Sequence, residues 1–294
     1  MSIVKSLSVG VGGMFYIRHG SDNFTMIDCY MPRLRQNSIL YELNLQAAGK
    51  GIVRFISTHP DDDHIKGLTA LHEQMNLANF YCVRNGTTKP DQTDDFDQYC
   101  ALRDDPAKAF YIFKGCSRKW MNLGDEKRGE SGISILWPDP TNQDYREALR
   151  RAADGQCPNN ISAIVQYFYQ GGATIIWMGD LETNFMENLG MIPVGAADIL
   201  FAPHHGRDSG RVPAEWLDQI QPKLIIVGEA PAEYLHYYPD YDTITQNSAG
   251  DITFDCRAGR TDIYVSEWDY SVDFLTDFGM VDNHGGKYIG SLEH

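Results

Sequence analysis

The stretch Ser57-Thr58-His59-Pro60-Asp61-Asp62-Asp63-His64 places two imidazoles and three carboxylates within six consecutive positions, directly after the mostly apolar run 52–56. Imidazole and carboxylate are side chains that bind divalent metals. In an extended segment, residues two apart point the same way, so His59, Asp61 and Asp63 can converge on one side. His64 can join them if the chain turns into a helix there. An acidic turn with incidental histidines is the plainer interpretation, but other parts of the chain supply matching partners.

Two later segments end apolar strands with the same kind of chemistry. Asp180 follows the apolar run 175–178, although a carboxylate in that position could serve only as a helix cap. His204 and His205 follow the apolar run 199–201, although an adjacent histidine pair could occur by chance. Three strand ends that all carry metal-binding side chains are much less expected by accident than any one of them. The sequence therefore predicts that these three segments meet.

The composition is that of a globular protein with a sizeable core. The chain has 294 residues, of which 43% are hydrophobic and 22% are charged. No spacer rich in Pro, Gly or Ser divides it, so we expect one domain over residues 1–291. The terminal Leu292-Glu293-His294 resembles the start of an affinity tag, so residues 292–294 are left out of the predicted domain.

The net charge of -15 argues against broad electrostatic binding of nucleic acid, which depends on Lys and Arg neutralising phosphates. A local basic pocket is compatible with it. No run is long and apolar enough to span a bilayer, and the first residues lack the pattern of a signal peptide. The six cysteines are scattered without a CxxC pair, which is typical of buried thiols in a reducing cytosol. We expect a cytoplasmic protein without membrane contact, and an oligomer or a partner protein is possible.

Strand-like segments precede helix-like segments in both halves of the chain. The first 30 residues suit a β-hairpin, and the acidic segment 90–97 is expected as a solvated loop or helix face. Further strands are expected at 52–57, 80–83, 133–137, 164–168, 174–178, 199–201, 224–227 and 262–265, and helices at 35–48, from Ile65 through Leu71, and at 144–153, 181–189 and 213–220. This order predicts a layered α/β architecture.

The motifs and their spacing resemble those of the metallo-β-lactamase superfamily. His59-Pro60-Asp61-Asp62-Asp63-His64 is a variant of that family's H-x-H-x-D-H signature, with Asp61 at the position of the second histidine. The variant is similar to the ComEC-like branch, which comprises the metallo-hydrolase domain of a competence protein and its free-standing relatives. Further segments match this branch in order across residues 4–240: Val9-Gly10-Val11-Gly12, Ile27-Asp28-Cys29, Asn159-Asn160-Ile161-Ser162, Met178-Gly179-Asp180-Leu181-Glu182 and Ala202-Pro203-His204-His205-Gly206.

The resemblance implies a four-layer αββα sandwich of the metallo-β-lactamase type that holds two divalent cations. Carried over by position, it assigns His59 and Asp61 to one cation, and Asp63, His64 and His205 to the other. Asp180 would bridge the two cations. Asn160 lies nearest to the position of the family's middle histidine ligand, which this chain lacks. His205 is preferred as the ligand over His204, which would contact a neighbouring group or a phosphate. Asp28 is expected at best as a hydrogen-bond partner of a ligand.

The family's late G-H-P motif has no full counterpart. Tyr238 stands where its histidine would be, and His236 lies two residues earlier. Together with His204, these side chains could protonate a leaving group at the rim of the site. Packing against the sheet is the more ordinary role for Tyr238. Asp63 and Asp180 are expected to take part in catalysis through the cations that they hold.

Two cations roughly 3.5–4 Å apart can share a hydroxide and clamp both the attacking and the leaving oxygen. The pKa of bound water falls toward roughly 7, so no protein nucleophile is needed. Asp61 in place of a histidine makes the ligand set richer in oxygen, which suits manganese, while zinc stays compatible. We therefore expect zinc or manganese.

The motif set implies a metal-dependent hydrolase of phosphodiesters, either a nuclease or a phosphodiesterase for nucleotides or small phosphate esters. The acidic composition favours short or single-stranded nucleic acid, or small substrates, over long duplexes. One alternative is a hydrolase of a carbonyl substrate, such as a lactone, thioester or lactam. Another is a non-catalytic module of a defence or DNA-uptake system.

Overall fold

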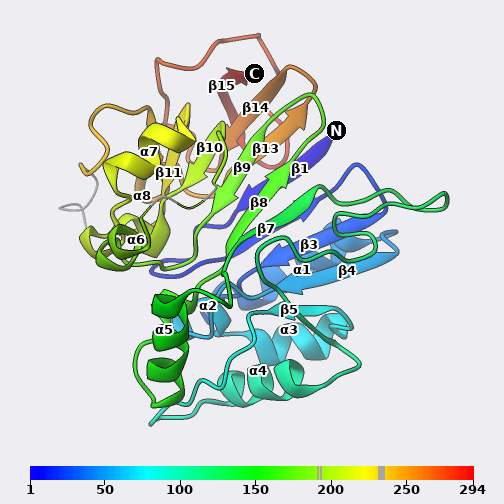
Figure 1. Ribbon diagram of the computed structural model, residues 1–294. Coiled ribbons are helices and arrows are strands. Elements are labelled where there is room, and N and C mark those ends of the chain that lie inside the picture. The colour runs from blue at the N-terminus through cyan, green and yellow to red at the C-terminus, as the bar shows by residue number, and fades with distance from the viewer. Residues whose placement is uncertain (191, 193, 231–235) are drawn as a thin grey trace.

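The computed structural model describes residues 1–190, 192, 194–230 and 236–294. In this part of the chain, the strands form two mixed sheets that lie against each other (Figure 1). The nine-stranded sheet has the order β15 (Lys287–Glu293), β14 (Arg260–Val265), β13 (Ile252–Arg257), β1 (Ser2–Ser6), β2 (Phe15–Arg18), β3 (Asn23–Ile27), β4 (Ile52–Ile56), β5 (Phe80–Cys82) and β6 (Ala109–Tyr111). The six-stranded sheet has the order β12 (Thr243–Thr245), β11 (Leu224–Val227), β10 (Ile199–Phe201), β9 (Thr174–Trp177), β8 (Ile164–Phe168) and β7 (Ile133–Trp137).

Each sheet contains a parallel and an antiparallel half. Strands β3 to β6 run parallel, and so do β9 to β12. The carboxyl ends of parallel strands meet at one edge of a sheet, where connecting loops leave room for a site. The segments singled out in the sequence follow β4, β9 and β10, so both parallel halves contribute to the same place.

Helices cover one outer face of the nine-stranded sheet. This layer consists of α1 (Gln36–Ala47), α3 (Leu68–Met75) and α4 (Asp94–Asp104). Their buried apolar side chains share one core with Phe24 and Phe55 of the sheet. A second core fills the space between the sheets, where Phe201 contacts Phe15 at 5.0 Å and stacks on Trp177 at 5.1 Å between ring centroids. Apolar residues inside such layers are the main source of stability.

A second group of helices lies on the side of the six-stranded sheet (Figure 1). It includes α5 (Gln143–Ala153), α6 (Thr183–Leu189) and α7 (Ala214–Ile220). Trp137 of β7 contacts Tyr145 of α5 and Phe185 of α6, at 5.6 and 6.4 Å between ring centroids. The short helices α2 (Asp62–Ile65) and α8 (Gln246–Ala249) complete the fold. The prediction of a layered α/β architecture is confirmed at this level.

The predicted strands and helices agree with the structure to within a few residues, with one instructive difference. The helix expected from Ile65 begins at Asp62 and is interrupted, so that α2 and α3 are separate. Gly67 marks the break, with φ at +109°, and a Cβ there would lie 2.9 Å from the Cβ of Met31. Glycine is therefore required between the two helices.

The acidic segment 90–97, expected as a solvated loop or a helix face, leads into a helix, and several other elements were not expected from the sequence. Helix α4 occupies part of the acidic stretch, and its N-cap Thr93 accepts a hydrogen bond from the backbone of Phe96 at 3.2 Å. Three acidic residues in the first turn favour the helix through its dipole. Strands β6, β12, β13 and β15 were also missed. The last of these includes Leu292 and Glu293, which pair with Thr261 and Arg260; that residues 292–294 derive from a tag stays a prediction.

Among the described residues, no helix combines the length and the apolar character needed to cross a bilayer.

Candidate metal centre

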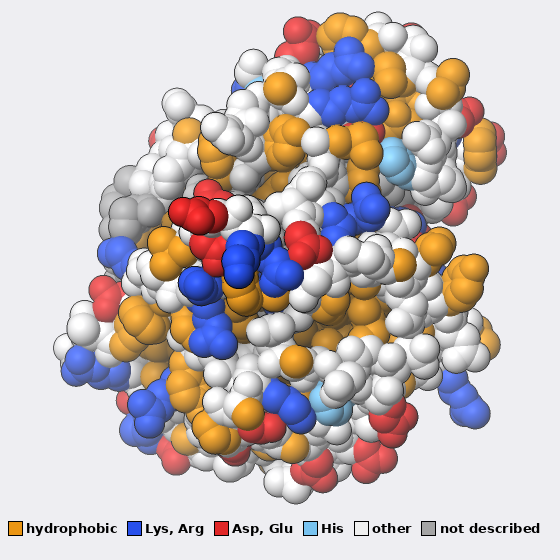
Figure 2. All heavy atoms as spheres, turned by 90° about the vertical axis from the view of Figure 1, so that its right-hand side faces the viewer, with side chains coloured by type: hydrophobic (Ala, Val, Ile, Leu, Met, Phe, Trp, Pro, Cys, Tyr) orange, Lys and Arg blue, Asp and Glu red, His pale blue; other side chains and the backbone are white. Residues whose placement is uncertain are grey.

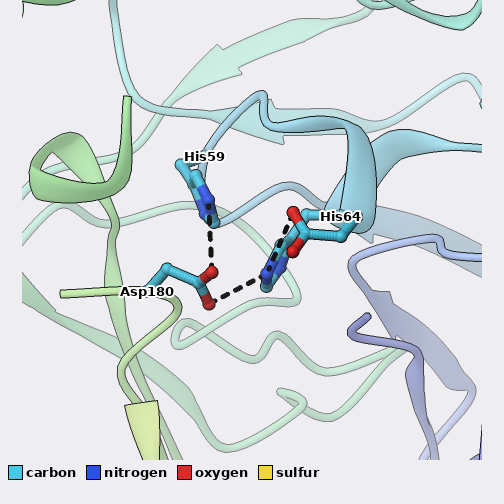
Figure 3. A group of neighbouring side chains, drawn as sticks. His59, His64 and Asp180 are labelled. Carbon is cyan, nitrogen blue, oxygen red and sulfur yellow. Dashed lines mark ion pairs between the residues drawn. The ribbon is translucent and has the colours of Figure 1, made fainter. Parts of the chain in front are cut away.

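Three strand ends bring their polar residues together between the two sheets. His59, Asp63 and His64 follow β4, and Asp180 follows β9. Figure 3 shows the carboxylate of Asp180 facing the imidazoles of His59 and His64. One nitrogen or oxygen atom from each of His59, Asp63, His64 and Asp180 lies within 4.8 Å of the others. The expected meeting of the segments around 59–64 and 180 is therefore present.

Asp180 is the centre of the cluster. Its Oδ1 lies 2.9 Å from His64 Nε2, and its Oδ2 lies 3.6 Å from His205 Nε2 and 3.9 Å from His59 Nε2. His205 Nε2 also lies 3.4 Å from Asp63 Oδ2. Two ligand atoms on one tetrahedral zinc ion are separated by roughly 3.4 Å when the bonds are about 2.1 Å long. Most of these separations are those of atoms that can share a cation.

The unsatisfied atoms of the cluster test this fit directly. Among the described residues, the buried atoms that make no hydrogen bond of normal geometry include His59 Nε2 and His205 Nε2, together with His64 Nε2 and Asp180 Oδ1, which face each other at 2.9 Å. Each such atom costs about 1–3 kcal/mol when it is left unpaired. All four belong to the same cluster and are donor atoms that zinc and manganese accept. The residues therefore fit a divalent cation.

Asp28, at the end of β3, fixes the orientation of His64. Its carboxylate accepts hydrogen bonds from the backbone and the hydroxyl of Thr58, both at 2.7 Å, and lies 2.7 Å from His64 Nδ1. A carboxylate on the far nitrogen holds a histidine ring so that its other nitrogen faces the metal. Asp28 adopts a left-handed backbone conformation with φ at 55°, which is strained for a residue other than glycine. The structure therefore places Asp28 where the sequence expected a ligand's partner.

The residues around Asp180 explain the sequence Gly179-Asp180. Gly179 has φ at +54°, and a Cβ there would lie 2.7 Å from Ser162 Oγ. The hydroxyl of Ser162 accepts a hydrogen bond from the backbone of Asp180 at 3.0 Å. Any side chain at 179 would push this support away, so glycine lets the carboxylate reach the cluster.

The two adjacent histidines take different positions. Both have left-handed backbone conformations, with φ at 51° for His204 and 56° for His205. His205 is buried and turns its Nε2 toward Asp63 and Asp180. His204 is more exposed, its Nδ1 lies 2.8 Å from Ser209 Oγ, and its Nε2 lies 3.9 Å from Asp180 Oδ2. This arrangement matches the preferred assignment of His205 as a ligand and His204 as its neighbour.

Asp61 is not brought into the cluster. Its Oδ1 accepts hydrogen bonds from Lys89 Nζ and from the backbone of Asp62, both at 2.9 Å. As the N-cap of α2, it satisfies the start of that helix. Lys89 also lies 2.8 Å from Asp62, so the lysine neutralises the carboxylates that face away from the histidines. The expected pairing of Asp61 with His59 is absent for this reason.

The side chain of Asn160 also forms hydrogen bonds outside the cluster. Its amide nitrogen donates to Glu182 Oε2 at 2.6 Å, and its carbonyl oxygen accepts from the backbone of Glu182 at 3.1 Å. Both ends of the amide are therefore used, and no atom faces the cluster as a ligand. Glu182 is the N-cap of α6 but makes no side-chain cap bond, which leaves its carboxylate for Asn160.

The two late candidates lie away from the cluster. Tyr238 is buried, and its hydroxyl accepts a hydrogen bond from the backbone of Val212 at 3.3 Å. Burial raises the pKa of Tyr238 to about 12, so it serves packing better than proton donation. His236 is exposed and is not part of the cluster. Residues 231–235, directly before it, lie outside the described part of the chain.

The charges of the cluster are strongly coupled. Burial lowers the pKa of His59 to about 4, with a further contribution from the charge of His64. Burial opposes the charge on His64, but Asp180 and Asp28 outweigh it and raise its pKa well above the usual value. Burial also disfavours the ionised form of Asp63, but His205 and His64 outweigh it and lower its pKa to about 2. Without a metal, a proton on His64 therefore supplies the positive charge between two carboxylates.

Sequence reasoning missed Lys89 and Ser162 as supporting residues of the site. Lys89 lies 28 positions from Asp61 and belongs to no motif, so only the fold reveals it. We compared the chain with protein-family models and with curated proteins, and neither comparison found a match. The family resemblance of the motifs therefore stays a prediction, and the geometry of the site carries the argument about function.

Proposed function

We propose that this protein is a metal-dependent hydrolase with a fold of the metallo-β-lactamase type. Two facing sheets with helices on both sides support the four-layer αββα assignment, and so does the position of the motifs at strand ends. Six unpaired cysteines support the predicted cytoplasmic location, since disulfides are rare there.

One observation carries the proposal: among the described residues, the buried atoms His59 Nε2 and His205 Nε2 have no hydrogen-bond partner, and the only partners that His64 Nε2 and Asp180 Oδ1 face are other ligand atoms of the cluster. Buried polar groups in folded proteins are nearly always paired. Unsatisfied atoms also occur in the buried pair Asp255 and Asp262, but there arginine side chains supply the positive charge. At the candidate centre, bound cations would supply it, because each deprotonated ligand atom can give a cation a lone pair.

The ligand atoms divide into two groups around Asp180. His64 lies beside one carboxylate oxygen of Asp180, and His205 and His59 lie beside the other. We propose that Asp180 bridges two cations, zinc or manganese, and that Asp61 completes the position beside His59 when Lys89 releases it. Imidazole together with carboxylate suits either metal.

When bound, such cations make hydroxide available near neutral pH and hold phosphate oxygens. The chain's own residues orient this chemistry. Asp28 keeps His64 in position through its far nitrogen, and Ser162 holds the backbone of Asp180. Burial lowers the pKa of His204, so its neutral ring can give a hydrogen bond to a substrate oxygen.

The hollow at the cluster itself is small, about 30 Å³, and two larger surface hollows meet at Glu182, two residues after Asp180. One of about 310 Å³ is lined by Asp144, Glu147 and Glu182. The other, of about 530 Å³, is lined by Glu182, Glu187 and Asp208. Arg151 and Arg211 are the basic residues in their walls, so carboxylates predominate. A long polyanion would be repelled along this surface, and we propose a small phosphodiester or a short single strand as substrate.

Hydrolysis of bis-p-nitrophenyl phosphate by the zinc- and manganese-loaded protein tests the proposal. We expect turnover with at least one metal and none after Asp63→Ala. Turnover of a chromogenic lactam or lactone alone would replace the phosphodiester with a carbonyl substrate. Less than one metal per chain after reconstitution would instead favour a non-catalytic module.

A further inference from the structure

A further hollow lies beside β4, β5 and β6. It has a volume of about 330 Å³ and is lined by residues that include Asn79, Tyr81, Phe110, Arg118, Lys119 and Trp120; we name it the Arg118 cleft. It shares no lining residue with the candidate metal centre. Its volume is within the range of roughly 300–1,000 Å³ of small-molecule sites.

Two guanidinium groups share one aromatic ring beside this cleft. Arg118 lies 5.9 Å from the ring centroid of Tyr81 and 4.7 Å from that of Phe110. The guanidinium of Arg54 lies 5.6 Å from the ring centroid of Tyr81, and Arg54 is fully buried. Two cations this close to one ring create a positive potential in a partly dry environment.

No carboxylate neutralises this pair in the described part of the chain. The hydrogen-bond acceptors of Arg54 are neutral: Asn23 Oδ1 at 3.0 Å, Thr25 Oγ1 at 3.1 Å and the carbonyl of Trp120 at 2.9 Å. Its Nε has no partner. Burial, and to a smaller degree Arg118, lowers the pKa of Arg54. A buried charge without a counter-charge is costly, and an anion in the cleft would relieve that cost.

The wall formed by Trp120 is rigid despite strained backbone geometry. Trp120 has φ at 64°, which is unusual for a bulky side chain. Its backbone nitrogen donates to the carbonyl of Leu123 at 2.7 Å, and its indole donates to Asp125 at 3.2 Å. Arg128 lies over its ring at 4.7 Å. Backbone strain that is maintained by surrounding contacts is characteristic of binding sites formed before the ligand arrives.

We propose that the Arg118 cleft binds a nucleotide, with the phosphate at Arg118 and Lys119 and the base against the aromatic side chains. Stacking on aromatic rings and charge-assisted hydrogen bonds from arginine are the two contacts that nucleotides use. Asn79 donates its amide to the carbonyl of Val53, which leaves its oxygen as an acceptor for a base edge. Figure 2, which faces the right-hand side of Figure 1, shows basic side chains near the middle of that face with acidic side chains beside them. The proposal does not depend on hydrolase activity.

Calorimetric titration of the EDTA-treated protein with adenosine 5′-monophosphate tests the proposal. We expect binding that weakens at least about tenfold in Arg118→Gln, because hydrogen bonds to charged groups are the strong ones. Adenosine and inorganic phosphate alone should each bind more weakly than the whole nucleotide. Binding of phosphate as tight as that of the nucleotide would remove the base from the proposal.

Arg84→Gln is the matched control, since Arg84 lies over the ring of Tyr111 at 5.6 Å and does not line the cleft. Its binding should equal that of the unaltered protein. Should Arg118→Gln unfold, Lys119→Gln replaces it, because that side chain is 67% exposed and its loss leaves the fold intact. The proposal is overturned if the nucleotide does not bind, or if neither Arg118→Gln nor Lys119→Gln weakens it more than Arg84→Gln does.

Discussion

Two clusters of histidine and aspartate with buried carboxylates occur in the described part of this protein, and their carboxylates have different positively charged partners. In the first, the candidate metal centre, the ion-pair partners of Asp180 among the described residues are all imidazoles. In the second, Asp255 and Asp262 stand directly opposite each other on β13 and β14. Like charges in such cross-strand positions repel. The second cluster therefore needs cations as much as the first does.

The second cluster supplies its own cations. Arg257 lies 2.7 Å from Asp255, and Arg260 lies 2.9 Å from Asp262. His284 lies 3.4 Å from Asp255. Buried acids and histidines therefore do not identify a metal site by themselves. What distinguishes the first cluster is that no lysine or arginine, among the described residues, forms an ion pair with Asp63 or Asp180.

The largest effect is expected from Asp180→Asn. This change removes the charge that both groups of ligands share, so metal content and hydrolysis should fall by at least about 100-fold, beyond the loss typical of a ligand's partner. Metal analysis and phosphodiester turnover measure it. Asp255→Asn is the matched control and should keep full metal content. Equal loss in both variants would erase the distinction between the clusters.

A smaller loss is expected from Asp28→Asn. The amide still accepts from Thr58 but no longer presents a charge to His64, so metal affinity should drop about 10–100-fold. Competition with a chelator of known affinity gives the value. Unchanged affinity would mean that the histidine ring needs no external support.

The stability of the metal-free protein should depend on pH through His59. Its pKa of about 4 lies below the ordinary value of 6.5, so between these values the unfolded chain binds the extra proton. Stability should therefore fall as the pH decreases from 6.5 toward 4. Urea unfolding of the EDTA-treated protein measures this slope, and His59→Gln should flatten it. An identical slope in that variant would assign the dependence to other groups.

The smallest effect is expected from Lys89→Gln. Removing this lysine leaves the carboxylates of Asp61 and Asp62 without their cation, so affinity for a second metal should rise by up to about tenfold, as expected from one partly exposed charge pair. Titration with manganese after one equivalent has bound measures the gain. Lys89→Arg keeps the charge and should behave like the unaltered protein. A decrease in Lys89→Gln would show that the lysine supports the site and does not compete for it.

The sequence was most informative where one local rule dominates. Continuous apolar runs predicted β4, β9 and β10, because strands buried on both faces need no polar alternation. The polar residues of the candidate site were predicted because they directly follow these runs. The partners of Asp61 and Asn160 could not be predicted, because Lys89 and Glu182 come close to them only in the folded chain. Strand β13 was missed because Asp255 interrupts its apolar pattern, and Arg257 and His284 make that carboxylate tolerable there.

The proton on His64 has a consequence for the order of assembly. Small zinc modules fold only when their metal arrives, because their ligands repel one another without it. Here His64 can stand between Asp28 and Asp180 as its own counter-ion. The chain can therefore reach its final architecture without a cation. If the proposed cations bind afterwards, His64 would release its one extra proton as it becomes a ligand, whereas His59, whose pKa is about 4, is already neutral.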